Sequence, residues 1–161
     1  MPDSPADRLS AASMSSWKLV IGRLDKIVAE TSDADFQREV APGRNRIFYI
    51  IGHLAAVHDR MFALLGVGER LHPELDAEFL ENPDTHGGGS LSPAQLRSVW
   101  TEINAKLTST LERLSPDEWL AKHTAVSDED FQKEPHRNRL SVLLSRTNHA
   151  SFHTGQLRLT Q

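Results

Sequence analysis

The sequence of 161 residues contains no cysteine. This absence excludes disulfides, thiolate metal ligands, iron–sulfur clusters and a cysteine nucleophile. Any metal site must therefore be built from histidine, aspartate and glutamate. Eight histidines in a chain of this length make such a site worth seeking.

Other absences restrict the location and the partners. The formal net charge is −4 and no block of lysine and arginine occurs, which argues against nucleic-acid binding because that affinity rests on neutralising phosphates. No apolar run approaches the roughly 20 residues that span a bilayer. The start, MPDSPADRL, lacks the basic and apolar regions of a signal peptide. We expect a cytoplasmic protein with no nucleic-acid or membrane partner.

Four long segments repeat apolar residues at helical spacing, and strand-like alternation is nowhere sustained. The first begins near residue 15, and the second runs from about Asn45 to Leu65. The third follows Ser92, which opens a capping box with proline at the first helical position. The fourth runs from about Asn138 to the C-terminus, and Ser115 caps a short extra helix before it.

This pattern predicts an all-α protein, a four-helix bundle formed by a single domain over residues 1–161. Residues 1–12 are expected to be disordered or loosely ordered. The connection of residues 67–91 between the second and third helices is long for a bundle. It is expected either to cross the bundle end or to hold a lid over a pocket.

One connector occurs twice. SDADFQREVAPGRNR, residues 32–46, and SDEDFQKEPHRNR, residues 127–139, agree at ten of thirteen paired positions when Val40 and Ala41 are set aside as an insertion. Each copy joins the two helices of a hairpin, so the chain is predicted to consist of two related hairpins, roughly 15–66 and 92–161.

Both copies are interpreted mainly as architecture. A serine should cap a short acidic turn in each, and Phe36 and Phe131 should anchor that turn against the bundle end. The arginines are expected to pair with the aspartates, with binding of an anionic substrate group as the alternative. These are Arg44, Arg46, Arg137 and Arg139 with Asp33, Asp35, Asp128 and Asp130.

The fourth helix carries the candidate chemistry. At 100° per residue one stripe of this helix contains Val142, Arg146, His149, His153 and Gln156. The two histidines are four residues apart, so their rings can hold one ion. Gln156 lies one turn beyond, suited to a supporting hydrogen bond, and Arg146 is a candidate for anchoring a substrate. An H-x-x-x-H pair alone is weak evidence, but this helix is otherwise poor in charge and predicted to be buried.

A third ligand should come from the facing helix, in the stretch IIGHLAAVHDR. Helical geometry does not choose between His53 and His58, which lie at opposite margins of the apolar stripe. Either one is also compatible with an ordinary hydrogen-bonded histidine of the core.

GHLAAVHDRMF, followed about ninety residues later by NHASFHTGQLRL, resembles the DinB-like family of metal-binding four-helix bundles. The resemblance implies that His53, His149 and His153 bind a divalent metal, nickel or zinc, and that the protein forms a homodimer. The family includes thiol-dependent S-transferases and a maleylpyruvate isomerase, so membership does not define the reaction.

We therefore expect a metal-dependent enzyme of the hydrolase or thiol-dependent S-transferase type. Its partners would be a small-molecule substrate and, for the transferase, a low-molecular-weight thiol. One alternative is a non-catalytic bundle that binds a metal or a small molecule. Another is a metal-free bundle whose histidines are satisfied core residues.

Overall fold

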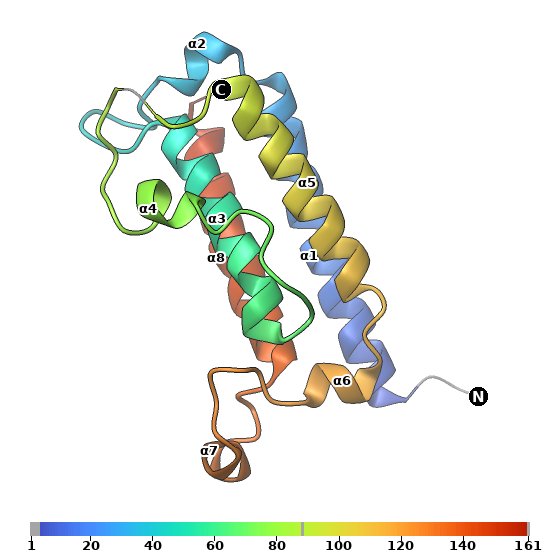
Figure 1. Ribbon diagram of the computed structural model, residues 1–161. Coiled ribbons are helices and arrows are strands. Elements are labelled where there is room, and N and C mark those ends of the chain that lie inside the picture. Colours follow the sequence, from blue (N-terminus) through green and yellow to red (C-terminus); the bar gives the residue numbers. More distant parts are fainter. Residues whose placement is uncertain (1–3, 88, 161) are drawn as a thin grey trace.

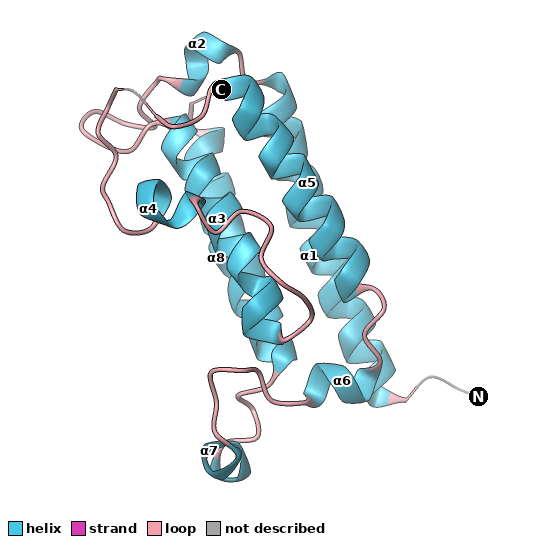
Figure 2. Cartoon of the chain, in the orientation of Figure 1, coloured by secondary structure: helices cyan, strands magenta, loops and turns pink. Residues whose placement is uncertain are grey.

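Four long helices form most of the described chain, residues 4–87 and 89–160, in this computed structural model (Figure 1). The long helices are α1 (Pro5–Glu30), α3 (Ile47–Leu65), α5 (Pro93–Leu111) and α8 (Arg139–Arg158). The short helices are α2 (Asp33–Phe36), α4 (Leu75–Phe79), α6 (Pro116–Leu120) and α7 (Asp128–Lys133). Over these residues the chain forms no strand, only two isolated bridges (Figure 2). The predicted all-α helix bundle is confirmed.

The long helices follow an up, down, down, up order (Figure 1). Because α3 and α5 run in the same direction, the connection of residues 67–91 has to return along the whole of α3, a length of about 28 Å for a helix of its size. It does so with α4 packed against α3. The connection therefore runs beside α3 instead of crossing the bundle end, which corrects that expectation.

Three helices begin with the same local signal, serine then proline with an acceptor side chain two residues later. Ser4, Ser92 and Ser115 each form a capping box with that acceptor. The expectation that residues 1–12 are loosely ordered is wrong for residues 5–12, because α1 begins at Pro5. The Ser4 hydroxyl accepts from the Asp7 amide, and the Asp7 carboxylate accepts from the Ser4 amide at 2.7 Å. Residues 1–3 lie outside the described residues.

The core lies between the four long helices and is built around two tryptophans. Trp17 of α1 and Trp100 of α5 are both buried, and their indole nitrogens donate to Thr108 and Asp25. Helix α3 is long and apolar enough to span a membrane by length and composition alone. Its most apolar window is 67% buried inside the bundle, as expected for the central helix of a core.

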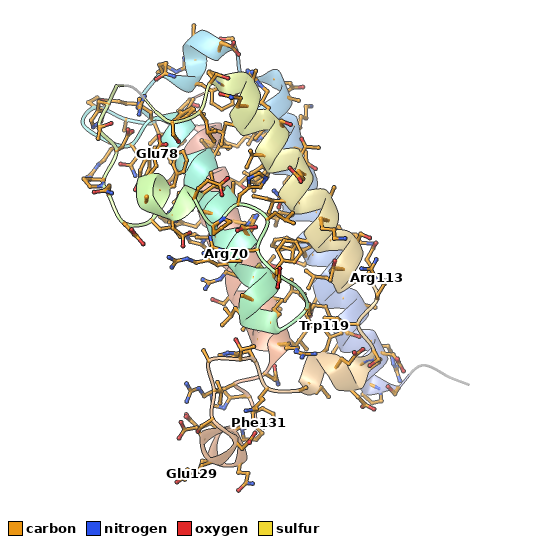
Figure 3. The ribbon with its side chains drawn as sticks, in the orientation of Figure 1. Arg70, Glu78, Arg113, Trp119, Glu129 and Phe131 are labelled. Carbon is orange, nitrogen blue, oxygen red and sulfur yellow. The ribbon has the colours of Figure 1, made fainter. Side chains whose placement is uncertain are left out.

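The two connector copies begin alike and pack differently. Ser32 and Ser127 cap α2 and α7 with the same backbone angles, φ −68° and ψ 160°. Phe36 is buried against the bundle, as expected, whereas α7 has no buried residue and carries Phe131 beyond the end of the bundle (Figure 3). The anchoring role predicted for Phe131 is wrong, because the second copy has no helix beneath it.

The pairing predicted for the connector arginines is also wrong. Arg46 instead binds Asp84 of the long connection at 2.6 Å, with both side chains almost wholly buried. Arg137 pairs with Glu134 of its own copy at 3.2 Å. Asp33 forms its ion pair with Arg97 of α5.

Candidate metal centre

Three histidines from two helices converge at the surface between α3 and α8. Nε2 of His53 lies 3.2 Å from Nε2 of His149, which lies 3.1 Å from Nε2 of His153. Each ring is partly exposed. Among the described residues, this is the one group of histidines and carboxylates whose ligand atoms come close enough to hold a metal ion, all within 4.8 Å of one another.

The helix register of α8 explains how two of these rings meet. His149 and His153 stand one turn apart on the same face. Ala150 and Leu157, on the adjacent face of α8, are completely buried and hold the helix against the bundle. The two imidazoles consequently lie at the boundary between core and solvent, facing His53 of α3.

Hydrogen bonds at the far side of two rings determine which nitrogen faces the cluster. Nδ1 of His53 donates to the backbone carbonyl of Phe79 at 3.1 Å, since a carbonyl can only accept. Nδ1 of His153 donates to Oε1 of Gln156 at 2.7 Å. In both neutral rings Nε2 is therefore left with a lone pair that points into the cluster, the arrangement found in metal-binding histidines.

Burial disfavours the charged form of two of the three rings, His149 and His153. Burial, followed by the charges of His153, His53 and Arg146, lowers the pKa of His149 from 6.5 to about 4. Burial also lowers the pKa of His153, although the bond to Gln156 opposes it. No carboxylate joins the cluster within residues 4–87 and 89–160. If Nε2 of His149 carried a proton, it could donate a hydrogen bond to only one of the two neighbouring Nε2 atoms. A metal cation, in contrast, could accept the lone pairs of all three nitrogens.

Two of the three nitrogen–nitrogen separations fit a shared metal ion. For a metal–nitrogen bond of 2.0–2.1 Å, two ligand nitrogens lie about 3.3 Å apart at a tetrahedral angle and about 2.9 Å apart at a right angle. The observed 3.2 and 3.1 Å fall between these values. Three neutral nitrogen donors suit zinc, nickel and related transition metals better than magnesium or calcium.

The remaining candidates occupy distinct positions. His58 is completely buried on the core side of α3, where Nδ1 contacts Oδ1 of Asn104 at 2.8 Å and burial lowers its pKa to about 3. It therefore lies outside the cluster, and the choice that helical geometry left open falls on His53. Gln156 makes the supporting bond expected of it. Arg146 lies beside the cluster, close enough for its charge to affect the pKa of His149.

Sequence reasoning missed the group that orients His53. The carbonyl of Phe79 ends α4, in the long connection, and no residue pattern identifies a backbone acceptor. One signal was available, the glycine immediately before His53 in an apolar helix. A Cβ at Gly52 would lie 2.2 Å from the Phe79 ring. The glycine therefore leaves room for the ring of Phe79, the residue whose backbone carbonyl accepts from His53.

The comparisons with known proteins assign the chain to a family. The DinB superfamily model matches residues 16–157, a range that contains all three histidines. The chain belongs to the DinB superfamily. The resemblance noted from the sequence is thereby confirmed.

A solved structure agrees with this assignment. The DinB-superfamily chain is similar to a conserved protein from Enterococcus faecalis, with a TM-score of 0.60 over 94% of each chain at 18% identity. At that identity the likeness concerns the fold. The search of curated proteins found no match.

Proposed function

We propose that this DinB-superfamily protein is a metal-dependent enzyme in which His53, His149 and His153 hold a divalent ion, nickel or zinc. The observation that carries the proposal is the convergence of three Nε2 atoms, two of them oriented by acceptors behind the ring. Such an ion would supply Lewis acidity, which lowers the pKa of a water or thiol ligand or polarises a carbonyl.

The donor set favours catalysis over a structural role. Structural zinc sites use four protein ligands, whereas catalytic sites use three and keep a position for water or substrate. Across the described residues no fourth histidine or carboxylate joins the cluster. The compatible reactions are hydrolysis and thiol-dependent S-transfer, the latter with a low-molecular-weight thiol as the second substrate.

A pocket beside the cluster offers space for the substrate. It has a volume of about 540 Å³ and is lined by His153 and Gln156 of α8, by Ile50 of α3 and by residues 40, 41 and 43–45 of the first connector. This volume lies within the range of small-molecule sites. A larger groove between α1 and α5, about 660 Å³, contains none of the three histidines.

Elemental analysis of the purified protein tests the metal. The wild type should carry about one nickel or zinc ion per chain, and the double variant His149→Ala, His153→Ala should carry none. His58→Gln is the matched control, because it changes a histidine of the same bundle that lies outside the cluster. Negligible metal in the wild type would refute the proposal.

A substrate screen tests catalysis separately. The metal-loaded protein would be assayed with hydrolysable esters and amides, and with electrophiles in the presence of low-molecular-weight thiols. Turnover that disappears in the double variant supports an enzyme and distinguishes transferase from hydrolase. Metal binding without turnover across the screen would favour the non-catalytic binding protein. Sedimentation of the same samples tests the proposed homodimer.

A further inference from the structure

A second pocket opens near the start of α8, at the opposite end of that helix from Gln156. Its volume is about 280 Å³. The side chains that give it chemical character are cationic or polar: His123, His136, Arg137, Ser141, Ser145 and Arg146. The second connector copy contributes two of them, so the copy that fails to dock on the bundle still forms a wall of a cavity.

Arg146 and Arg139 are the two partly buried arginines that form no ion pair among the described residues, and of the two only Arg146 lines this pocket. Arg46, Arg70 and Arg97 each reach at least one aspartate at 2.9 Å or less. The guanidinium of Arg146 has its Nε atom buried and without a hydrogen-bond partner. No carboxylate within the described residues pairs with it, and burial, followed by repulsion from Arg60, lowers its pKa.

An unpaired buried cation is costly, since a buried charge is normally matched by a counter-charge. For Arg46, Arg70 and Arg97 the fold supplies this anion. The absence of one at Arg146, in a cavity open to solvent, is the arrangement expected when a ligand supplies it.

His123, on another wall of the same pocket, also has an unpaired ring nitrogen. Nδ1 of His123 is buried and has no partner, and burial together with the charge of Arg137 lowers the pKa of this ring. The backbone around it is held in place, because the amide of Thr124 donates to the carbonyl of Leu64 at 3.0 Å. Two side chains with an unpaired nitrogen, from separate segments, thus line one small cavity.

We propose that this pocket binds the oxyanion of a small molecule, a carboxylate or a phosphate, through the side chains of Arg146 and His123. Arg137 adds positive charge at the pocket and is engaged only by Glu134 on the surface. The two serines add hydroxyl groups. The volume is at the lower limit for small-molecule sites, so the pocket accommodates a charged group with a few attached atoms.

The position of the pocket connects it to the metal centre. Arg146 precedes His149 by three residues on α8, about 4.5 Å along the helix axis. An acid bound at Arg146 would lie within about one helical turn of His149. The substrate class indicated is therefore an acid, either a carboxylic acid or a phosphate ester. This last step rests on the proposed function, whereas anion binding itself does not.

Titration of the full-length protein with inorganic phosphate and, in parallel, with succinate tests the site at low ionic strength. Proton–nitrogen NMR follows the Nε–H of Arg146 and the ring of His123, and calorimetry gives the affinities. We expect saturable shifts of both groups with at least one anion. The anion that binds more tightly identifies the phosphate or the carboxylate as the ligand class.

Arg146→Gln should weaken binding by about tenfold or more, the usual effect of losing a hydrogen bond to a charged group. Arg23→Gln removes the same charge from an exposed position of α1 and should leave the affinity unchanged. Equal weakening by both variants would overturn the proposal, because it would show general counter-ion attraction. No shift of the Arg146 Nε–H with either anion would also overturn it.

The double variant His149→Ala, His153→Ala separates this proposal from the metal centre. Anion binding should persist in that variant, because neither histidine lines the pocket. Loss of anion binding together with the histidines would contradict the assignment to Arg146 and His123. Retention of anion binding in a wild type that binds no metal would refute only the proposed function.

Discussion

Gly52 is a position from which one methyl group should affect the metal centre without changing a ligand. The change is Gly52→Ala. An added Cβ would lie 2.2, 2.4 and 2.5 Å from three atoms of the Phe79 ring. That ring cannot swing aside easily, because it is completely buried and packs against Phe48 and Tyr49 at centroid distances of 5.8 and 5.9 Å.

The expected effect on stability combines two opposing terms. Overpacking of a core costs about 1–3 kcal/mol. Replacing a helix glycine by alanine returns about 1 kcal/mol. We therefore expect Gly52→Ala to lower the free energy of unfolding of the metal-free protein by up to about 2 kcal/mol, measured by urea denaturation.

The expected effect on metal binding follows from the displaced carbonyl. If Phe79 moves, its carbonyl no longer accepts from Nδ1 of His53, and the ring loses both its tautomer and its orientation. Loss of such a supporting bond reduces metal affinity by about 10- to 100-fold. Competition with a chromophoric zinc chelator would measure this change.

Two other helix glycines provide matched controls. A Cβ at Gly22 in α1 or at Gly155 in α8 would meet no heavy atom within 4 Å. Gly22→Ala and Gly155→Ala should raise stability by about 0.5–1 kcal/mol and leave zinc affinity unchanged. If Gly52→Ala is destabilised but binds zinc as tightly as the wild type, the Phe79 carbonyl does not position His53. If its stability also resembles that of the controls, the close approach of the Phe79 ring is itself refuted.

Three further predictions concern other groups. Gln156→Ala should weaken zinc binding by about tenfold, because Nδ1 of His153 loses its acceptor; chelator competition measures it, and an unchanged affinity would contradict the role of Gln156. The pKa of His58 is about 3 in the folded protein and 6.5 in the unfolded chain, so the unfolded state takes up the proton first as the pH falls. Stability should therefore fall between pH 6.5 and 3, by about 1.4 kcal/mol per pH unit from this group; urea denaturation at several pH values should show a smaller slope for His58→Gln than for the wild type. Asp84→Asn should cost about 3–5 kcal/mol in thermal or urea unfolding, because it leaves Arg46 buried without its counter-charge, and restoration by the double change Arg46→Met, Asp84→Leu would show that the charge, not the packing, is responsible.

Structural features that depend on only a few neighbouring residues could be predicted from the sequence. Each serine–proline pair marks a helix start because the serine hydroxyl accepts from the backbone amide of the residue two positions beyond the proline. The side chain of that residue accepts in turn from the backbone amide of the serine. The same serine–proline pattern at Ser4 and Pro5 marks the start of α1. The spacing of His149 and His153 likewise determines that their rings share a face, because the α-helical repeat is invariant.

The third ligand was not determined in this way. His53 and His58 lie on the same helix, at opposite margins of one apolar stripe, and periodicity alone treats them alike. Packing separates them: α8 lies against one margin, and Asn104 of α5 lies against the other. The acceptor behind His53 comes from a segment 26 residues away, a distance over which no local rule operates.

The duplicated connector likewise combines features determined by its local sequence with features determined by tertiary packing. Its sequence alone determined the caps, and Ser32 and Ser127 adopt the same backbone angles because an Asx-like turn depends only on neighbouring residues. Only the tertiary structure decided that Phe36 is buried and that Phe131 is not, because burial depends on which helices lie beneath. The composition without cysteine required that any metal site use histidine, aspartate or glutamate. The order of the helices in space decided which three histidines meet.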